Sequence, residues 1–286
     1  MNEVPNSAGT SAPRFRAPAS ACDCHIHIYD DARFTPARAG VKGVARATTA
    51  DYRLFQQRIG TSRVVVVQPA VYGTDNAVTL DAVQQLGAAN ARGIGVVHPT
   101  VTDMELLAMK RGGIRGFRFT LHEPRTAVTS AEMIEPIAHR AARIDLHVQL
   151  HLRAEQLLEM ADLVLRLPGT VVIDHMGRLP LPGHGAFDVV RRVLDTGRGW
   201  VKLSGPYLES RSSSPHYADM KPVAQALIAH APQRCVWGSD WPHPTEPHTK
   251  PDDATLFDLL ADWAPSEPLR EKILVSNAAE LYGFGA

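Results

Sequence analysis

Short runs rich in β-branched residues alternate with amphipathic stretches from residue 22 almost to the end of the chain. This alternation is typical of βα units around a parallel sheet, because each buried strand is followed by a helix that covers it. The predicted strands are 22–29, 62–69, 93–99, 114–120, 145–152, 170–177, 199–205 and 234–242. We therefore predict an α/β fold, a single (β/α)₈ TIM barrel over 21–286, with extra C-terminal helices within 253–283.

Composition limits where the chain works and what it binds. Residues 1–20 are rich in Pro, Ser, Ala and Gly and lack the apolar core of a signal peptide, so we expect a flexible N-terminal segment. No apolar run approaches the roughly 20 residues that span a bilayer, which favours a cytoplasmic protein without a membrane partner.

The charges of the chain balance, because Lys+Arg and Asp+Glu both number 30, so no net field attracts nucleic acid. Cys22, Cys24 and Cys235 are expected to be structural thiols. A homo-oligomer remains open.

The position of polar residues along the predicted strands selects candidates for chemistry. In such barrels the reactive groups lie at the C-terminal ends of the strands, because the following loops converge there. A polar residue at the end of a strand is therefore a site candidate, whereas one elsewhere is more often structural. The residues selected in this way are His25, His27, Arg118, His151, His175, Ser204 and Asp240.

His25 and His27 lie two residues apart, so both imidazoles point to one face of the first strand. They are either hydrogen-bonded core groups or part of a site at the barrel mouth. Asp240 follows the eighth strand, which adjoins the first when a barrel closes, and this favours the site. Asp174 and His175 have opposite pleat parity, so we expect His175 to face inward and Asp174 to be a structural group in the barrel wall.

Three motifs in order carry a family resemblance. They are H-x-H on the first strand, D-H-x-G near the middle, and W-G-S-D-W-P-H late in the chain. Together they resemble the amidohydrolase superfamily, in the branch that includes 2-pyrone-4,6-dicarboxylate lactonase and sugar-acid lactone enzymes such as D-galactarolactone isomerase. The resemblance implies lactone hydrolysis, with Asp240 as general base and His25, His27 and His175 as hydrogen-bond donors to the lactone carbonyl.

The branch that this chain resembles is largely metal-independent. Binuclear amidohydrolases commonly use a carboxylated lysine on strand four, where this chain has Arg118, a permanent cation and a poor neighbour for a metal. We therefore predict that no cofactor is required. An alternative stays open, because His151 ends strand five: His25, His27, His151 and Asp240 offer a mononuclear zinc site.

Four arginines, Arg118, Arg125, Arg178 and Arg211, fall on the predicted rim although the chain has no net charge. Together they predict a small anionic substrate with one or two carboxylates. Tyr207 in the same rim and His151 are further candidates for substrate contact, although Tyr207 can equally be a packing residue.

The predicted function is hydrolysis of the ester bond of a carboxylate-bearing lactone, similar to 2-pyrone-4,6-dicarboxylate or a sugar-acid lactone. Alternatives are a lactone isomerase of the same branch, or a metal-dependent decarboxylase or amidohydrolase. A barrel that only binds a small acid is disfavoured, because such a protein has no need of Asp240 together with three histidines at one rim.

Overall fold

Eight parallel strands form one nearly closed barrel, in the order β1 to β8, as predicted. The computed structural model describes residues 3–37, 46–123, 127–212 and 214–285. The strands are β1 Cys22–Ile26, β2 Arg63–Val67, β3 Ala91–Gly95, β4 Ile114–Thr120, β5 His147–His151, β6 Val171–Ile173, β7 Gly199–Leu203 and β8 Cys235–Trp237.

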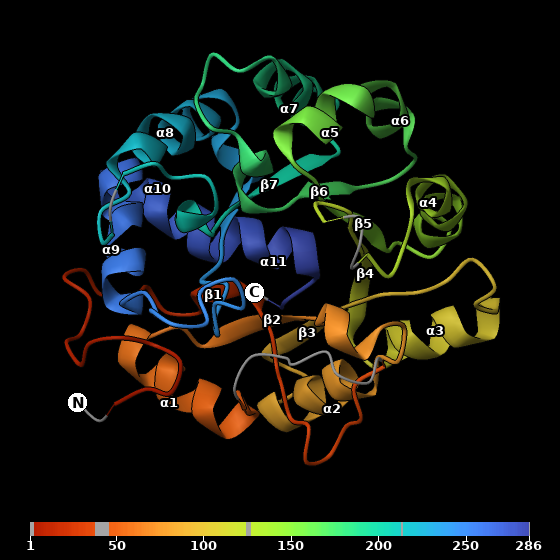
Figure 1. Cartoon of the computed structure of the whole chain (residues 1–286), viewed down its shortest axis with the longest axis horizontal. Helices are drawn as coiled ribbons and strands as arrows, with labels where there is room; N and C mark the ends of the chain where they lie inside the picture. Colours follow the sequence, from red (N-terminus) through yellow and green to blue (C-terminus); the bar gives the residue numbers. More distant parts are fainter. Residues whose placement is uncertain (1–2, 38–45, 124–126, 213, 286) are drawn as a thin grey trace.

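A ring of helices surrounds the barrel (Figure 1). They are α1 Thr49–Ile59, α2 Ala77–Leu86, α3 Asp103–Arg111, α4 Ile134–Ala142, α5 Ala154–Glu159, α6 Ala161–Arg166, α7 Gly185–Asp195, α8 Lys221–His230, α9 Asp253–Trp263, α10 Glu267–Glu271 and α11 Asn277–Tyr282. The last three confirm the predicted C-terminal helices. Capping boxes begin α1 at Thr48 and α3 at Thr102, since each threonine side chain accepts from a backbone N–H three residues on. Among the described residues, no helix is both long and apolar enough to cross a membrane.

Every strand except β4 ends before its predicted residue, and the early ends of β6 and β8 affect the candidate site. Strand six was expected to reach residue 177, but β6 ends at Ile173 because His175 and the next three residues all have positive φ. Strand eight was expected to reach residue 242, but β8 ends at Trp237, and Asp240 also has a positive φ of 65°. Left-handed backbone ends an extended strand, so His175 and Asp240 lie in loops just beyond their strands.

The apolar core has two parts. The larger lies between the sheet and the helices, and a smaller cluster fills the barrel interior with side chains such as Cys24, Val65 and Trp200. Tyr282 of α11 belongs to the inner cluster, and Arg92 of β3 donates to its carbonyl oxygen over 3.2 Å. The helix α11 therefore covers the N-terminal end of the barrel. All three cysteines are buried thiols, as predicted.

The N-terminal segment, residues 3–20, packs against the barrel, and its flexibility stays a prediction. The guanidinium of Arg58 in α1 is the reason, because it donates to the carbonyl oxygens of Ala8 and Ser11 and pairs with Asp252. Its side chain is only 1% exposed. Phe15 also stacks on Phe257 of α9, with ring centroids 4.4 Å apart. Composition alone does not reveal such partners, which lie far away in the sequence.

Strands β1 and β8 meet where the barrel closes. His27 N–H donates to the Trp241 carbonyl over 2.8 Å, and Asp240 N–H donates to the His25 carbonyl over 2.9 Å. Gly238 permits this close approach, since a Cβ built on it would lie 2.7 Å from the Cβ of His25. The contact between the two strands therefore sets the relative position of three candidate site residues.

Gly238→Ala tests this close approach. We expect the free energy of unfolding to fall by about 1–3 kcal/mol, because the added methyl overpacks a site bounded by backbone. The measurement is urea denaturation followed by circular dichroism. Gly185→Ala is the matched control, since its added Cβ would make only ordinary contacts with Leu158. Equal stability of the Gly238 variant and the wild type would contradict the interpretation.

Candidate active site

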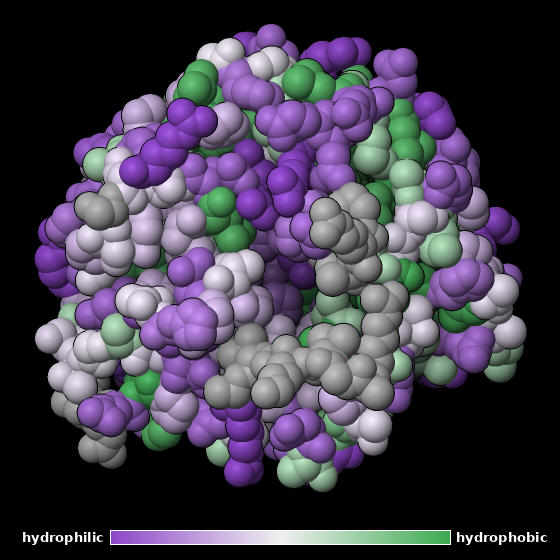
Figure 2. Space-filling model, in the orientation of Figure 1, coloured by the Kyte–Doolittle hydropathy of each residue, from purple (hydrophilic) through white to green (hydrophobic). Residues whose placement is uncertain are grey.

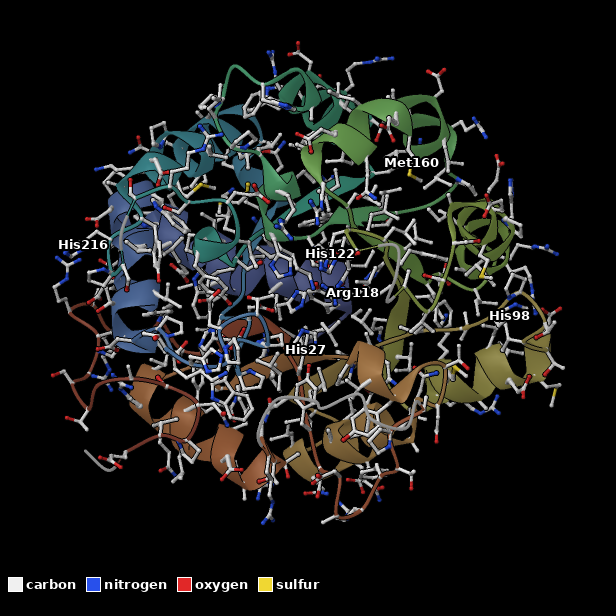
Figure 3. The ribbon with its side chains drawn as sticks, in the orientation of Figure 1. His27, His98, Arg118, His122, Met160 and His216 are labelled. Carbon is white, nitrogen blue, oxygen red and sulfur yellow. The ribbon has the colours of Figure 1, made fainter. Side chains whose placement is uncertain are left out.

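The predicted site residues gather at the C-terminal mouth of the barrel. Figure 2 shows a hollow near the centre of this face, with hydrophilic side chains around its floor. His27, Arg118 and His122 lie toward the middle of the ring of helices, whereas His98 and His216 lie at its periphery (Figure 3). Of these central residues, His27 and Arg118 had been selected from the sequence, whereas His122 had not.

Three imidazoles surround one oxygen of Asp240. The Nε2 atoms of His27, His25 and His175 lie 3.5, 3.6 and 4.0 Å from Oδ1. All four side chains are almost fully buried. The structure thus brings together the four residues that were predicted to be catalytic, although it does not test their roles.

A shift in register on β1 places His25 inside the barrel. The pairing of β1 with β2 changes between Asp23 and Ile26, which marks a bulge or similar irregularity. As a result Cys24 lies in the inner cluster, while the side chain of the next residue, His25, also lies near the interior groups Asp174 and Lys202. His27 shares this inward direction, as the two-residue spacing predicted.

Asp174 is not a group of the barrel wall, so that prediction is corrected. Its Oδ2 accepts hydrogen bonds from Arg118 Nε over 2.8 Å and from Gln149 Nε2 over 3.0 Å. Its Oδ1 lies 3.5 Å from His25 Nδ1 and 3.6 Å from Lys202 Nζ. Asp174 and His175 both reach the interior because the left-handed backbone at His175 breaks the strand alternation.

Lys202 of β7 is a site residue that the sequence analysis missed. Its ammonium is fully buried, donates to the Cys24 carbonyl over 2.8 Å, and lies 3.4 Å from His25 Nδ1. The rule for strand ends excluded it because it lies inside a strand. Pleat parity could have found it, since Lys202 lies two residues before Ser204, which had been selected at the end of the same strand, and so shares its face.

The electrostatics of the cluster favour charged carboxylates and neutral imidazoles. Burial raises the pKa of Asp174, but Arg118 and Lys202 lower it more, so the pKa lies well below its usual range. Burial likewise raises the pKa of Asp240, but the nearby histidines lower it more, so this pKa also lies well below its usual range. Burial lowers the pKa of His175 to about 4 and holds that of His25 well below 6.5. At neutral pH both of these rings are uncharged.

The three histidines differ in the hydrogen-bond partners of their ring nitrogens. Nδ1 of His27 lies 2.8 Å from the Val67 carbonyl, which only accepts, so its Nε2 carries a hydrogen only in the imidazolium form. Nε2 of His175 lies 3.3 Å from Nη2 of Arg118, which only donates. Nε2 of His25 has no hydrogen-bond partner among the described residues. His25 is therefore best placed to donate to a substrate.

Arg118 and His151 form the neighbouring part of the site. Nη2 of Arg118 lies 3.0 Å from His151 Nδ1, so the hydrogen of the neutral His151 ring is on Nε2. His122, which the sequence analysis did not select, stacks on His151 with ring centroids 4.0 Å apart. Burial, aided by Arg118, lowers the pKa of His122 to about 3. His122 and His151 thus present uncharged rings beside the buried guanidinium of Arg118.

The rim candidates have different surroundings. Arg178 pairs with Glu209, with Nε and Oε1 2.5 Å apart, and Arg211 is exposed. Arg125 lies outside the described residues. The hydroxyl of Tyr207 donates to Asp240 Oδ2 over 2.7 Å, so in this structure it contacts a site carboxylate. Ser204, the last selected residue, lies 2.9 Å from His175 Nδ1 through its Oγ.

One group of side chains in the described ranges could hold a metal ion. It consists of His25, His175 and Asp240, whose ligand atoms lie within 4.8 Å of one another. The alternative zinc set had His27 and His151 in place of His175, so the two sets share His25 and Asp240. The cations Arg118 and Lys202, close to His175 and His25, are unfavourable neighbours for a further cation.

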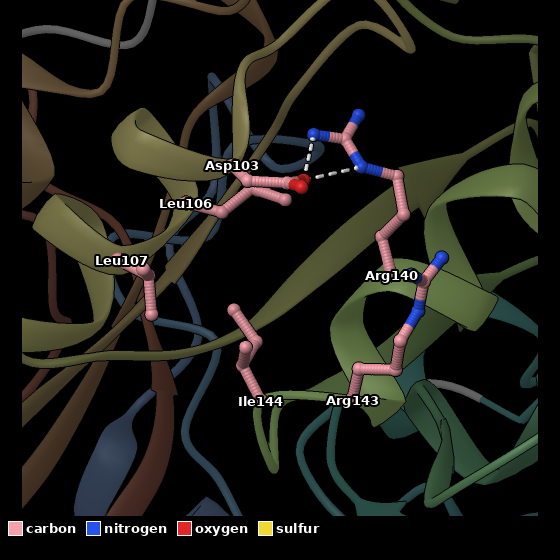
Figure 4. A pocket seen from close by; sticks show the side chains of 6 residues that line it. All are labelled: Asp103, Leu106, Leu107, Arg140, Arg143 and Ile144. Atoms are coloured by element: carbon pink, nitrogen blue, oxygen red, sulfur yellow. Dashed lines mark hydrogen bonds and ion pairs between the residues drawn. The ribbon is translucent and has the colours of Figure 1, made fainter.

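Another hollow lies away from the barrel mouth, between α3 and α4 (Figure 4). The ion pair of Arg140 and Asp103 spans one side, with Nη2 2.6 Å from Oδ1. Its other lining residues are Leu106, Leu107, Arg143 and Ile144. The residues that line this hollow include no histidine, cysteine or serine.

Comparison with known proteins agrees with the fold. The chain is 34% identical over 283 residues to 4-sulfomuconolactone hydrolase of Rhizobium radiobacter, covering 96% of this chain and 93% of that protein. It is 33% identical over 290 residues to 2-pyrone-4,6-dicarboxylate hydrolase of Comamonas testosteroni, covering 96% and 94%. An apo crystal structure from Agrobacterium tumefaciens matches with a TM-score of 0.88 and 29% identity, covering 98% of this chain and 99% of that one.

The profile of the amidohydrolase family matches residues 22–284, which contain the whole barrel and all three motifs. This match, two relatives above 30% identity and the superimposable fold agree with one another. The resemblance that the motifs predicted is thereby confirmed: the chain belongs to the amidohydrolase family.

Proposed function

We propose that this protein hydrolyses the ester bond of a carboxylate-bearing lactone. One observation carries the proposal: Asp240 presents a buried oxygen to three imidazole nitrogens at 3.5–4.0 Å. A carboxylate in that position can accept a proton from water beside groups that can stabilise a developing oxyanion. Two relatives of similar length are named as lactone hydrolases, which supports the same reaction class.

In the proposed reaction, Asp240 removes a proton from water while the water oxygen attacks the lactone carbonyl. His25 donates from Nε2 to the carbonyl oxygen as negative charge develops there. The ring C–O bond then breaks, and the departing alkoxide takes the proton from Asp240, which restores the carboxylate. His27, whose Nε2 lies 3.5 Å from Asp240, shares the proton during this cycle.

The lowered pKa of Asp240 favours an activated substrate. A carboxylate of low pKa is a weak general base, and general-base help contributes about 10²–10⁴-fold to a rate. This contribution is sufficient for an ester with a good leaving group, but small for an amide. The site therefore suits a lactone better than a peptide-like substrate.

The cations favour an acidic substrate. Arg118 is 6% exposed at the floor of the mouth, and its Nε and Nη2 already contact protein groups. A substrate carboxylate would therefore approach the remaining edge of the guanidinium and the His151 ring, whose Nε2 has no partner among the described residues. We propose this pair as the binding site for the substrate carboxylate.

We propose that hydrolysis needs no metal ion. Two histidines and one carboxylate offer fewer than the four ligands of an ordinary zinc site, although water can complete a catalytic one. A metal ion on Nε2 of His175 would lie close to the Arg118 guanidinium, and the two cations would repel each other. The fit to a resident metal is therefore poor, and no step above depends on one.

Asp240→Asn tests the general base. We expect kcat for lactone hydrolysis to fall by at least about 100-fold, because an amide does not accept the proton of water. The assay follows proton release from a panel of acidic lactones, with product analysis to separate hydrolysis from isomerisation. Asp195→Asn is the matched control, since Asp195 also contacts a histidine, His230, but at the surface. Near-wild-type kcat in the Asp240 variant would remove Asp240 from the mechanism.

Arg118→Met tests substrate charge. We expect KM for an acidic lactone to rise by the equivalent of about 1.5–3 kcal/mol, because a charge-assisted contact is lost. The thermal midpoint should also fall, since Asp174 loses a buried partner. Arg118→Lys should recover only part of the affinity, because an ammonium keeps the charge but not the planar fork. Equal losses on acidic and neutral lactones would show that Arg118 supports the barrel and does not contact the substrate.

Removal of metal ions tests the proposal that hydrolysis needs no metal. After dialysis against a strong chelator, we expect kcat to stay within about twofold of the untreated enzyme, because Asp240 itself activates the water. Elemental analysis of the same samples should find zinc well below one ion per chain. Stoichiometric zinc together with chelator-sensitive activity would contradict the proposal and favour the metal-dependent alternative.

A further inference from the structure

A hydrogen-bonded chain of side chains reaches Asp240 from outside the imidazole cluster. The hydroxyl of Tyr207 lies 2.7 Å from Asp240 Oδ2 and 3.0 Å from Nδ1 of His243. Nε2 of His243 lies 3.1 Å from both carboxyl oxygens of Asp253, the first residue of α9. The mechanism above uses none of Tyr207, His243 and Asp253, although His243 belongs to the late W-G-S-D-W-P-H motif.

The direction of each hydrogen bond follows from the donors available. The carboxylate of Asp240 only accepts, so the single Tyr207 hydrogen points to it. Tyr207 must then accept from Nδ1–H of His243. Nε2 of His243 faces the carboxyl group of Asp253, so a hydrogen bond joins this ring to Asp253. The four residues thus make one continuous chain, and it ends on Oδ2 of Asp240.

We infer that His243 and Asp253 are positioning residues that orient the Asp240 carboxylate through Tyr207. The chain occupies Oδ2 and so directs Oδ1 toward His25 and His27. A general base needs this restraint, because a small misplacement of a reacting group costs much of the rate. The inference rests on the proposed role of Asp240 as the base.

The backbone around Asp240 supports this role. Asp240 and His243 both have left-handed φ, 65° and 57°. Such conformations cost about 1–3 kcal/mol each for ordinary residues and persist where the surrounding structure holds them. Here His243 N–H donates to the Asp240 carbonyl over 2.7 Å, and Lys250 Nζ donates to the His243 carbonyl over 3.0 Å. Hydrogen bonds from both the backbone and the side chains therefore hold the loop in this conformation.

The far end of the chain is also fixed. Asp253 is 1% exposed and His243 is fully buried. The preceding residue, Asp252, pairs with Arg58 and caps α9 by accepting from Ala254 N–H over 2.9 Å. The carboxyl group that orients His243 is thus attached to a helix that cannot shift without breaking the partly buried ion pair of Arg58 and Asp252.

The kinetic test uses Tyr207→Phe, Asp253→Asn and the double variant. We expect each single change to lower kcat by about 10–100-fold, as loss of an orienting partner typically does. KM should change by less than about threefold, since the inference assigns the chain to Asp240 and not to substrate binding. The double variant should be no slower than the slower single variant, because both changes interrupt one chain. Losses that multiply, or that fall on KM, would overturn the inference.

Partial rescue and matched controls guard against simple misfolding. His243→Asn retains an N–H near the position of Nδ1 and should keep more kcat than His243→Leu at equal thermal midpoint. His230→Asn breaks a histidine–aspartate pair on the surface and should leave kcat unchanged. Tyr282→Phe removes a buried hydroxyl that has no partner among the described residues, and should do the same. Equal kcat in the two His243 variants would count against the chain.

A comparison of crystal structures distinguishes failure of this inference from failure of the proposed function. Crystal structures of the wild type and of Asp253→Asn should differ in the Asp240 side chain, whose Oδ2 should leave the Tyr207 hydroxyl in the variant. If the wild type turns over no lactone, the proposed function fails, but this comparison still decides the positioning role. An Asp240 carboxylate unmoved in the variant would overturn the inference whatever the activity.

Discussion

Burial of the Asp174 carboxylate is the constraint on which the barrel interior depends. An unpaired charge in that position would cost several kcal/mol, so the fold must supply compensating groups. Arg118 from β4, Gln149 from β5 and Lys202 from β7 all lie within 3.6 Å of its oxygens. One carboxylate thereby orients side chains from three different strands, and the rings of His25 and His175 pack around them. The same cations set the electrostatics of the mouth.

This arrangement keeps positive charge on arginine and lysine and leaves the imidazoles uncharged. Burial and the neighbouring cations hold the pKa values of His25 and His151 well below 6.5. The imidazoles can therefore donate hydrogen bonds to a substrate, or accept them, at neutral pH without first losing a proton to solvent. Asp240 faces the histidines and Tyr207, and no cation lies within 4 Å of it among the described residues. Its carboxylate is therefore the one that we propose as the general base.

The fold and much of the candidate site could be predicted because both depend on local patterns. Alternating strands and helices determine the barrel, and the two-residue spacing of His25 and His27 determines their common face. Lys202 was missed because position along a strand was used without pleat parity. Asp174 was misplaced because the backbone turns left-handed just after it, which the strand alternation does not indicate. The packing of residues 3–20 depends on Arg58, a partner about 50 residues away.

The contact between β1 and β8 has a consequence for synthesis of the chain on the ribosome. The strand β8, and the helix α11 that covers the inner cluster, are made after β1 to β7. Until then β1, with its two histidines, is an edge strand with one free side, and the barrel interior is open at one end. Early strands and helices can assemble during translation, but the proposed site is complete only after β8 and the Asp240 loop have emerged. A nascent chain that has not yet reached Asp240 therefore lacks the proposed site.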